Sequence, residues 1–94
     1  MALARVVTFE GVGKDRMAEL RQRLEAGERP AEIPASELIV LHDPEGEKSI
    51  AIVLFENEDD YQRGNEALNA MPGSDTPGQR TSVSKYEVAI RRTD

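Results

Sequence analysis

One run of six apolar residues decides the fold of this 94-residue chain: Ile50-Ala51-Ile52-Val53-Leu54-Phe55. A strand with one wet face alternates apolar and polar side chains, and this run does not alternate. A strand that is apolar on both sides has to be covered on both sides. The rest of the chain supplies two predicted helices, enough for one face of a sheet, so the run predicts that a second copy covers the other face.

The segments before this run predict a strand, a helix and a second strand. Residues 4–10 are rich in β-branched and aromatic side chains and predict the first strand. Asp15 is the predicted cap of a helix that ends at Gly27. The apolar positions of this helix recur at helical spacing: Met17, Leu20 and Leu24. A connector over 27–35 then leads to a strand over 37–42, apolar on both faces.

A tight turn joins this strand to the strand over 48–56. In Asp43-Pro44-Glu45-Gly46 the residue types suit a type I turn, with Gly46 supplying a positive φ. Asn57 then caps a second helix that starts with three acids. Its buried stripe is predicted to be Tyr61, Gly64, Leu68 and Met71. Gly64 costs helix stability, which indicates either close approach to the sheet or room for a ligand.

The second helix is predicted to end at Pro72-Gly73, with a polar loop over 74–80 behind it. The last strand is predicted over 82–91, as an edge strand with one partly wet face. One side of that strand carries Ser82, Ser84, Tyr86, Val88 and Ile90.

The resulting order, β-α-β-β-α-β, predicts one α+β domain over 1–94 of the ferredoxin-like type: a four-stranded antiparallel sheet with two helices on one face. The chain resembles the dimeric α/β-barrel superfamily, which includes antibiotic-biosynthesis-monooxygenase-like and stress-responsive domains. The resemblance rests on length, strand order, the doubly apolar runs 38–41 and 50–55, and the acidic helix start after Phe55-Glu56-Asn57. It implies a homodimer in which two sheets pack face to face, with the helices outside.

The charge and residue types of the chain limit the classes of partner that we expect it to bind. Eighteen acidic and twelve basic side chains give a net charge of −6, which argues against nucleic acid and anionic membranes as partners. Phe9 and Phe55 are the only strand aromatics that match an RNA-binding domain of this strand order, and both are better interpreted as packing residues. The chain has no cysteine, no apolar signal region and no run of about 20 apolar residues. We therefore expect a cytoplasmic protein.

Three residues are candidates for chemistry: His42, Tyr61 and Tyr86. His42 is the only histidine, and it is either a general base or haem ligand, or a strand-end residue that bonds the adjacent turn. Haem-degrading relatives in the resembled family use a tryptophan and a helix-borne histidine; this chain has no tryptophan, and His42 lies on a strand. Tyr61 and Tyr86 either approach each other and bind a phenolic or quinone-like substrate, or are core aromatics.

Two acidic clusters and a basic C-terminal pair are weaker candidates. The acids are Asp43, Glu45 and Glu47 at the hairpin, and Glu58, Asp59 and Asp60 at the helix start. Neither cluster has the calcium-loop pattern, and the helix dipole explains the second, so no metal or cofactor is predicted. Arg91 and Arg92 either pair with an anion or belong to a solvated tail.

Two functions of different class follow. The first is a homodimeric α/β-barrel protein that binds a small apolar or aromatic molecule without catalysis. The alternative is a cofactor-free monooxygenase-like or isomerase enzyme acting on a small aromatic or quinone-like substrate, which His42, Tyr61 and Tyr86 would orient. The small number of polar catalytic groups favours the first.

Overall fold

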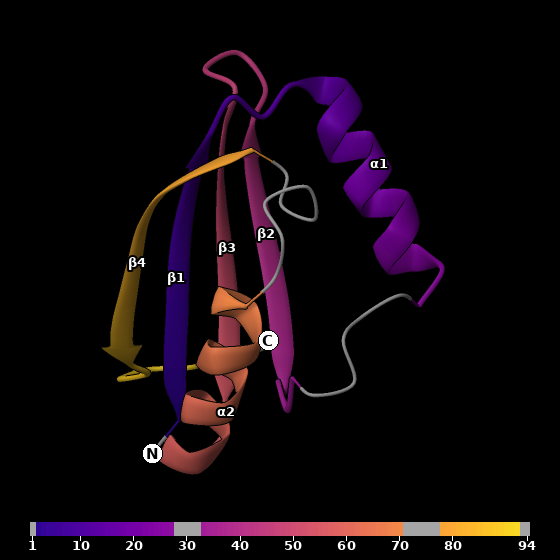
Figure 1. Cartoon of the computed structure of the whole chain (residues 1–94). Coiled ribbons are helices and arrows are strands. Elements are labelled where there is room, and N and C mark those ends of the chain that lie inside the picture. Colours follow the sequence, from indigo (N-terminus) through magenta and orange to yellow (C-terminus); the bar gives the residue numbers. More distant parts are fainter. Residues whose placement is uncertain (1, 28–32, 71–77, 93–94) are drawn as a thin grey trace.

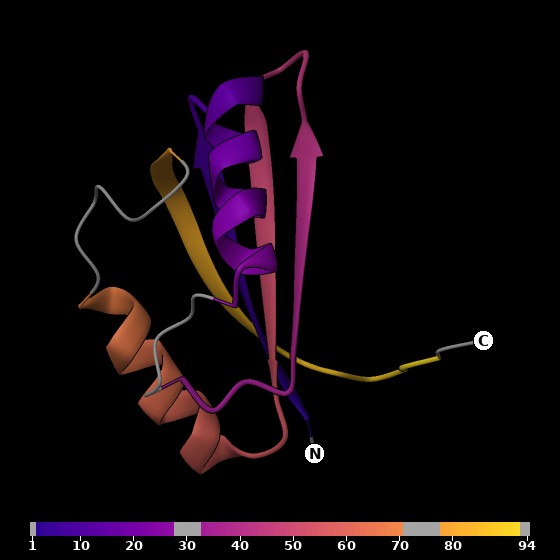
Figure 2. The same cartoon turned by 90° about the vertical axis from the view of Figure 1, so that its right-hand side faces the viewer.

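The computed structural model describes residues 2–27, 33–70 and 78–92. Its elements are β1 (Leu3–Glu10), α1 (Lys14–Glu25), β2 (Glu37–Asp43), β3 (Lys48–Phe55), α2 (Glu58–Asn69) and β4 (Gln79–Glu87). The strands form one antiparallel sheet in the order β2-β3-β1-β4 (Figure 1). Both helices lie on the same side of this sheet (Figure 2). The predicted α+β fold is confirmed, and it is compatible with a ferredoxin-like arrangement.

The pairing of the strands divides the hexad 50–55 between the two faces of the sheet. Directly opposed residues of an antiparallel pair project to the same side, and β3 pairs with β1 so that Phe55 opposes Leu3 and Val53 opposes Arg5. Phe55 and Val53 contact α2, so they define the helix face. Ile50, Ile52 and Leu54 project to the opposite side, which we call the open face.

The helix face carries two separate apolar clusters, one under each helix. The cluster under α2 consists of Leu3, Val53, Phe55 and Tyr61. The cluster at the start of α1 consists of Val7, Phe9, Val12 and Met17. Phe9 and Phe55 are buried in these clusters, so their predicted packing roles are confirmed.

Gly64 allows α2 to lie directly against the sheet. A Cβ atom at this position would overlap the Phe55 ring. That ring in turn meets Tyr61 edge-on, with centroids 5.5 Å apart. Of the two explanations offered for this glycine, close approach is therefore the one that the structure supports.

The first helix and the β2–β3 turn differ from the predictions in detail. Gly13, not Asp15, is the N-cap of α1, and it makes no side-chain cap bond; Asp15 lies inside the first turn, where its charge still suits the helix dipole. Gly27 has the predicted positive φ, at 85°. In the turn, Glu47 rather than Gly46 takes the left-handed conformation, and the Glu47 carbonyl accepts a 2.8 Å bond from the Val12 amide.

The last strand begins earlier and ends earlier than predicted. Glu87 opposes Leu3, the first residue of β1, so β4 has no partner strand beyond that point. Residues 88–92 leave the sheet on the open side (Figure 2), and Arg91 reaches Glu37 of β2 at 2.8 Å. This tail crosses one end of the open face, where Ala4 and Leu54 are each only 7% exposed. The predictions for Met71, Pro72-Gly73 and most of the two long connections lie outside the described residues.

Candidate functional site

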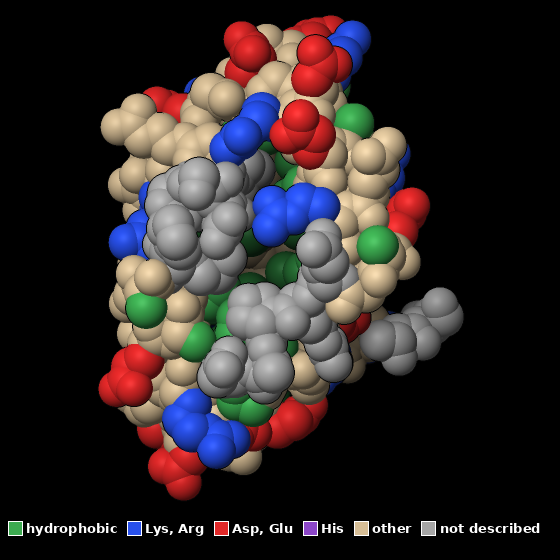
Figure 3. Space-filling view, turned by 45° about the vertical axis from the view of Figure 1, so that its right-hand side comes forward, with side chains coloured by type: hydrophobic (Ala, Val, Ile, Leu, Met, Phe, Trp, Pro, Cys, Tyr) green, Lys and Arg blue, Asp and Glu red, His purple; other side chains and the backbone are tan. Residues whose placement is uncertain are grey.

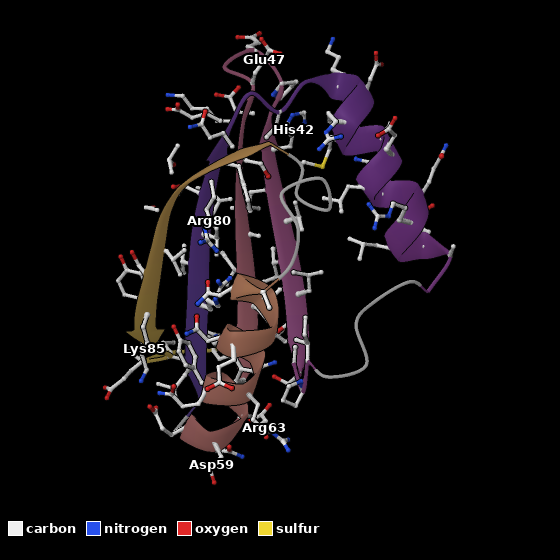
Figure 4. The ribbon with its side chains drawn as sticks, in the orientation of Figure 1. His42, Glu47, Asp59, Arg63, Arg80 and Lys85 are labelled. Carbon is white, nitrogen blue, oxygen red and sulfur yellow. The ribbon has the colours of Figure 1, made fainter. Side chains whose placement is uncertain are left out.

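His42 joins β2 to the connection between β1 and α1. Its Nε2 lies 2.9 Å from the carbonyl oxygen of Val12, and because a carbonyl only accepts, Nε2 carries the proton and donates. The side chain is partly buried at the hairpin end of the helix face (Figure 4). The bond goes to the backbone before α1 and not to the adjacent turn. This hydrogen bond gives His42 a structural role, because it connects β2 to the backbone that precedes α1.

Tyr61 and Tyr86 lie on opposite faces of the sheet. Tyr61 is buried on the side of α2 that faces the sheet, and the Nζ of Lys85 lies 4.8 Å from the centroid of its ring. Tyr86 opposes Ala4 on the open face and is 57% exposed. The sheet separates the two hydroxyls, and His42 is at the other end of the molecule. The structure therefore does not bring the three predicted residues into one site.

A recess lies between the two helices on the helix face. In Figure 1, α2 lies in front of one end of the sheet and α1 lies beside its β2 edge, toward the other end. Leu38 on β2 and Val83 on β4 remain 46% and 40% exposed on this side. Figure 3 shows hydrophobic side chains in a hollow, with Lys and Arg side chains beside them. We call this region, marked by Leu38 and Val83 at the two edges of the sheet, the helix-face recess; the side chains of Val7, Arg5 and Val53 between them are buried.

A buried cation lies between the two apolar clusters. Arg5 is only 3% exposed, and its Nε and Nη2 donate to the side-chain oxygens of Asn65 and Asn69 at 2.9 and 3.0 Å. The same Asn69 oxygen accepts a 3.0 Å bond from Nη1 of Arg80. Burial, and then the charge of Arg80, lower the pKa of Arg5, although a guanidinium stays protonated at neutral pH. Two guanidinium groups therefore converge on one amide oxygen.

A third cation on this face is neutralised. Lys85 opposes Arg5 in the sheet, and its Nζ donates to both carboxylate oxygens of Glu58, at 2.7 and 2.9 Å. These bonds, and then one from Gln62, lower the pKa of Glu58. Within 2–27, 33–70 and 78–92 neither Arg5 nor Arg80 has such a carboxylate partner.

The sequence analysis missed this cluster, although two signals point to it. Arg5 shares strand parity with Val7 and Phe9, which places its side chain on the buried face. Asn65 and Asn69 follow Tyr61 at four-residue intervals, which places both amides on the buried side of α2.

Several of the other candidates have side-chain partners within the chain, among them Asp43, which accepts a bond from the Gly46 amide, and Asp60, which pairs with Arg63. Glu58 bonds Lys85, and Arg91 bonds Glu37 and lies 3.6 Å from Glu56. Across the described ranges, His, Cys, Asp and Glu side chains do not gather in threes as a metal site requires. None of the helices in those ranges has the length and apolar character needed to cross a membrane.

Comparisons with known proteins do not assign this chain to a family, so the fold and the side-chain clusters described above are what define its class. No family model matches the chain, and no curated protein matches its sequence. The chain is an α+β domain with one face of its sheet under helices, the other largely uncovered, and a cationic cluster beneath α2.

Proposed function

We propose that the protein is a homodimer of the dimeric α/β-barrel type, formed by the open faces of two sheets, and that it binds a small apolar or aromatic molecule in the helix-face recess without catalysis. The observation that carries the dimer is the apolar character of the open face. Ile39, Leu41 and Ile50 are adjacent on β2 and β3 and are all substantially exposed in the single chain. Contiguous exposed apolar patches of this kind mark interaction sites.

The size of the open face suits a second copy. Four strands about 4.8 Å apart and about eight residues long cover roughly 500 Å² of flat area. That is of the same order as the roughly 800 Å² that each partner buries in a standard interface. Four half-exposed side chains on this face, Ile39, Leu41, Ile50 and Tyr86, contribute about half of 1.5–3 kcal/mol each on burial, or about 4 kcal/mol in total. Because association costs about 4–15 kcal/mol, further contacts are needed, and Ile90, 84% exposed in the tail, is placed to add one.

Two leucines of β2 provide a matched test of the dimer. Leu41 projects to the open face and Leu38 to the helix face, and they are 50% and 46% exposed. Leu41→Lys should convert the dimer to a monomer in sedimentation velocity at tens of micromolar, whereas Leu38→Lys should leave it dimeric. A monomeric wild-type chain, or equal behaviour of the two variants, would contradict the proposed interface.

Binding in the helix-face recess is supported by its exposed apolar lining. Leu38 is 46% exposed on this face in the single chain, and a small apolar ligand beside β2 would cover it. Binding is favoured over the enzyme alternative because catalysis requires convergent acid, base or nucleophilic groups, and His42, Tyr61 and Tyr86 lie apart.

The same pair of variants tests the recess. A neutral aromatic probe, 1-naphthol, should raise the melting temperature of wild type and of Leu41→Lys but not of Leu38→Lys. Leu41→Lys should therefore lose the dimer but keep the response to the probe, whereas Leu38→Lys should keep the dimer but lose that response. No stabilisation of wild type by the probe would count against the recess.

A further inference from the structure

The cluster around Arg5 has the features of an anion site that a neutral group fills. Burying a cation is costly unless an opposite charge or strong hydrogen bonds compensate for it. Lys85, one strand away, has Glu58 for this purpose. Arg5 is more deeply buried than Lys85, yet in the part of the chain that the structure describes its side-chain acceptors are the amides of Asn65 and Asn69.

The oxygen of Asn69 marks where an anion would sit. It lies 3.0 Å from Nη2 of Arg5 and 3.0 Å from Nη1 of Arg80, so it bridges two guanidinium groups. A carboxylate oxygen at that point would accept the same two bonds with a full charge, and such bonds are shorter and about twice as strong as neutral ones. Asn69 and Arg80 are both exposed, so the outer side of the bridge is open to solvent.

We propose that Arg5 and Arg80 form a binding site for the carboxylate of a small organic acid, whose oxygen displaces the side chain of Asn69 from between the two guanidinium groups. Arg80 reaches the site from the start of β4 (Figure 4). Asn65 holds Arg5 through Nε and leaves Nη2 for the ligand. The planar fork of a guanidinium matches a carboxylate, which a lysine ammonium does not.

The apolar part of this acid would lie in the helix-face recess, so this half of the inference rests on the proposed function. Arg5 opposes Val53, and Val53 opposes Leu38, so the guanidinium site and the exposed leucine belong to one row across the helix face. An aromatic or aliphatic monocarboxylic acid fits an anion site beside apolar side chains better than inorganic phosphate does. The same cationic pair would also attract phosphate, and the test separates the two.

The test compares three probes at constant ionic strength: 1-naphthoate, 1-naphthol and inorganic phosphate. By calorimetric titration, 1-naphthoate should bind wild type on the order of tenfold to a hundredfold more tightly than 1-naphthol, the range expected for hydrogen bonds to a charged group. Arg80→Gln should remove this margin. Arg63→Gln is the control, since Arg63 is an exposed arginine of α2 that pairs with Asp60 and should leave the margin unchanged.

A second variant supplies the anion from within the chain. Asn69→Asp should raise the melting temperature, because a carboxylate then bridges Arg5 and Arg80, and it should abolish the response to 1-naphthoate. Asn57→Asp is the control for binding: Asn57 accepts a bond from the Asp60 amide as the cap of α2, a bond that aspartate also accepts, although aspartate loses the 3.3 Å bond that the Asn57 amide donates to the Asp60 carboxylate. Binding of 1-naphthoate to this control should match wild type.

The outcomes separate the inference from the proposed function. Equal binding of 1-naphthol and 1-naphthoate, unchanged in Arg80→Gln, would overturn the carboxylate site and leave the recess standing. Phosphate binding as tight as 1-naphthoate binding, with both lost in Arg80→Gln, would keep the cationic site but overturn the organic acid as its ligand. A lower melting temperature for Asn69→Asp would overturn the anion position, and no binding of any probe would overturn both proposals.

Discussion

The two faces of this sheet bury apolar side chains by different means. On the helix face, Val53 and Phe55 of β3 are buried within the single chain, under α2. On the open face, Ile50 of the same strand remains 36% exposed, and only one end is crossed by the tail. One hexad therefore contributes to a core that the chain completes by itself and to a surface that it does not. Stability should depend mainly on the first, and assembly on the second.

The largest expected effect separates these two roles along β3. Phe55→Ala should lower the free energy of unfolding by about 3–5 kcal/mol, because it empties a fully buried site between β3 and α2. Ile50→Ala should cost the single chain far less and should weaken the dimer instead. Urea unfolding at two protein concentrations distinguishes the cases. A loss of stability at Ile50 equal to that at Phe55 would contradict the division of the faces.

A smaller effect is expected where α2 touches the sheet. Gly64→Ala should destabilise by about 1–3 kcal/mol, because the added methyl group meets the Phe55 ring. The penalty should shrink in a Phe55→Leu background, since the smaller side chain makes room, and this non-additivity is the sign of direct contact. Additive costs in the double variant would mean that the helix does not rest on that ring.

A third prediction concerns the hydrogen bond between His42 and the Val12 carbonyl, at the hairpin end of the helix face. His42→Ala should cost about 1 kcal/mol, the net value of one hydrogen bond, because the Val12 carbonyl loses its donor. His42→Gln should recover part of this cost, since its amide can donate. Chemical denaturation measures both, and a neutral His42→Ala would show that the bond does not hold the helix face together.

The smallest effect is the pH dependence of the Glu58–Lys85 pair. The pKa of Glu58 is lowered in the folded chain, so its contribution is present above the ordinary carboxylate pKa of about 4.3 and is lost as the pH falls through the lower folded value. Glu58→Gln should melt slightly below wild type at pH 7. The difference should vanish in acid, and a difference that grows in acid would contradict the sign.

The element order and the division of the hexad were predictable from sequence because both follow from local periodicity. Phe9 and Phe55 were placed in the core for the same reason. The path of the C-terminal tail was not predictable, because alternation continues to Ile90 while the partner strand ends at Leu3. Strand length depends on a neighbour as well as on the strand's own residues.

Whether Tyr61 and Tyr86 approach each other could not be decided from the sequence, for a related reason. Tyr61 lies on α2 and Tyr86 lies on β4, and only the register of the paired strands shows that their side chains lie on opposite faces of the sheet. Arg5 shares strand parity with Val7 and Phe9, but this local pattern does not show which groups compensate for its charge. Its burial results from a tertiary contact with Asn65 and Asn69, sixty or more residues away in the chain.

The most direct test of the central claim is a solvent-accessibility measurement of methyl groups on the two faces. A soluble paramagnetic agent broadens the NMR signals of exposed methyls, and in the single chain Ile50 and Leu24 are equally exposed, at 36%. If two open faces pack together, the methyls of Ile39, Leu41 and Ile50 should be protected, while those of Leu24 on α1 are broadened. Equal broadening of Ile50 and Leu24 at dimer-forming concentrations would contradict the account.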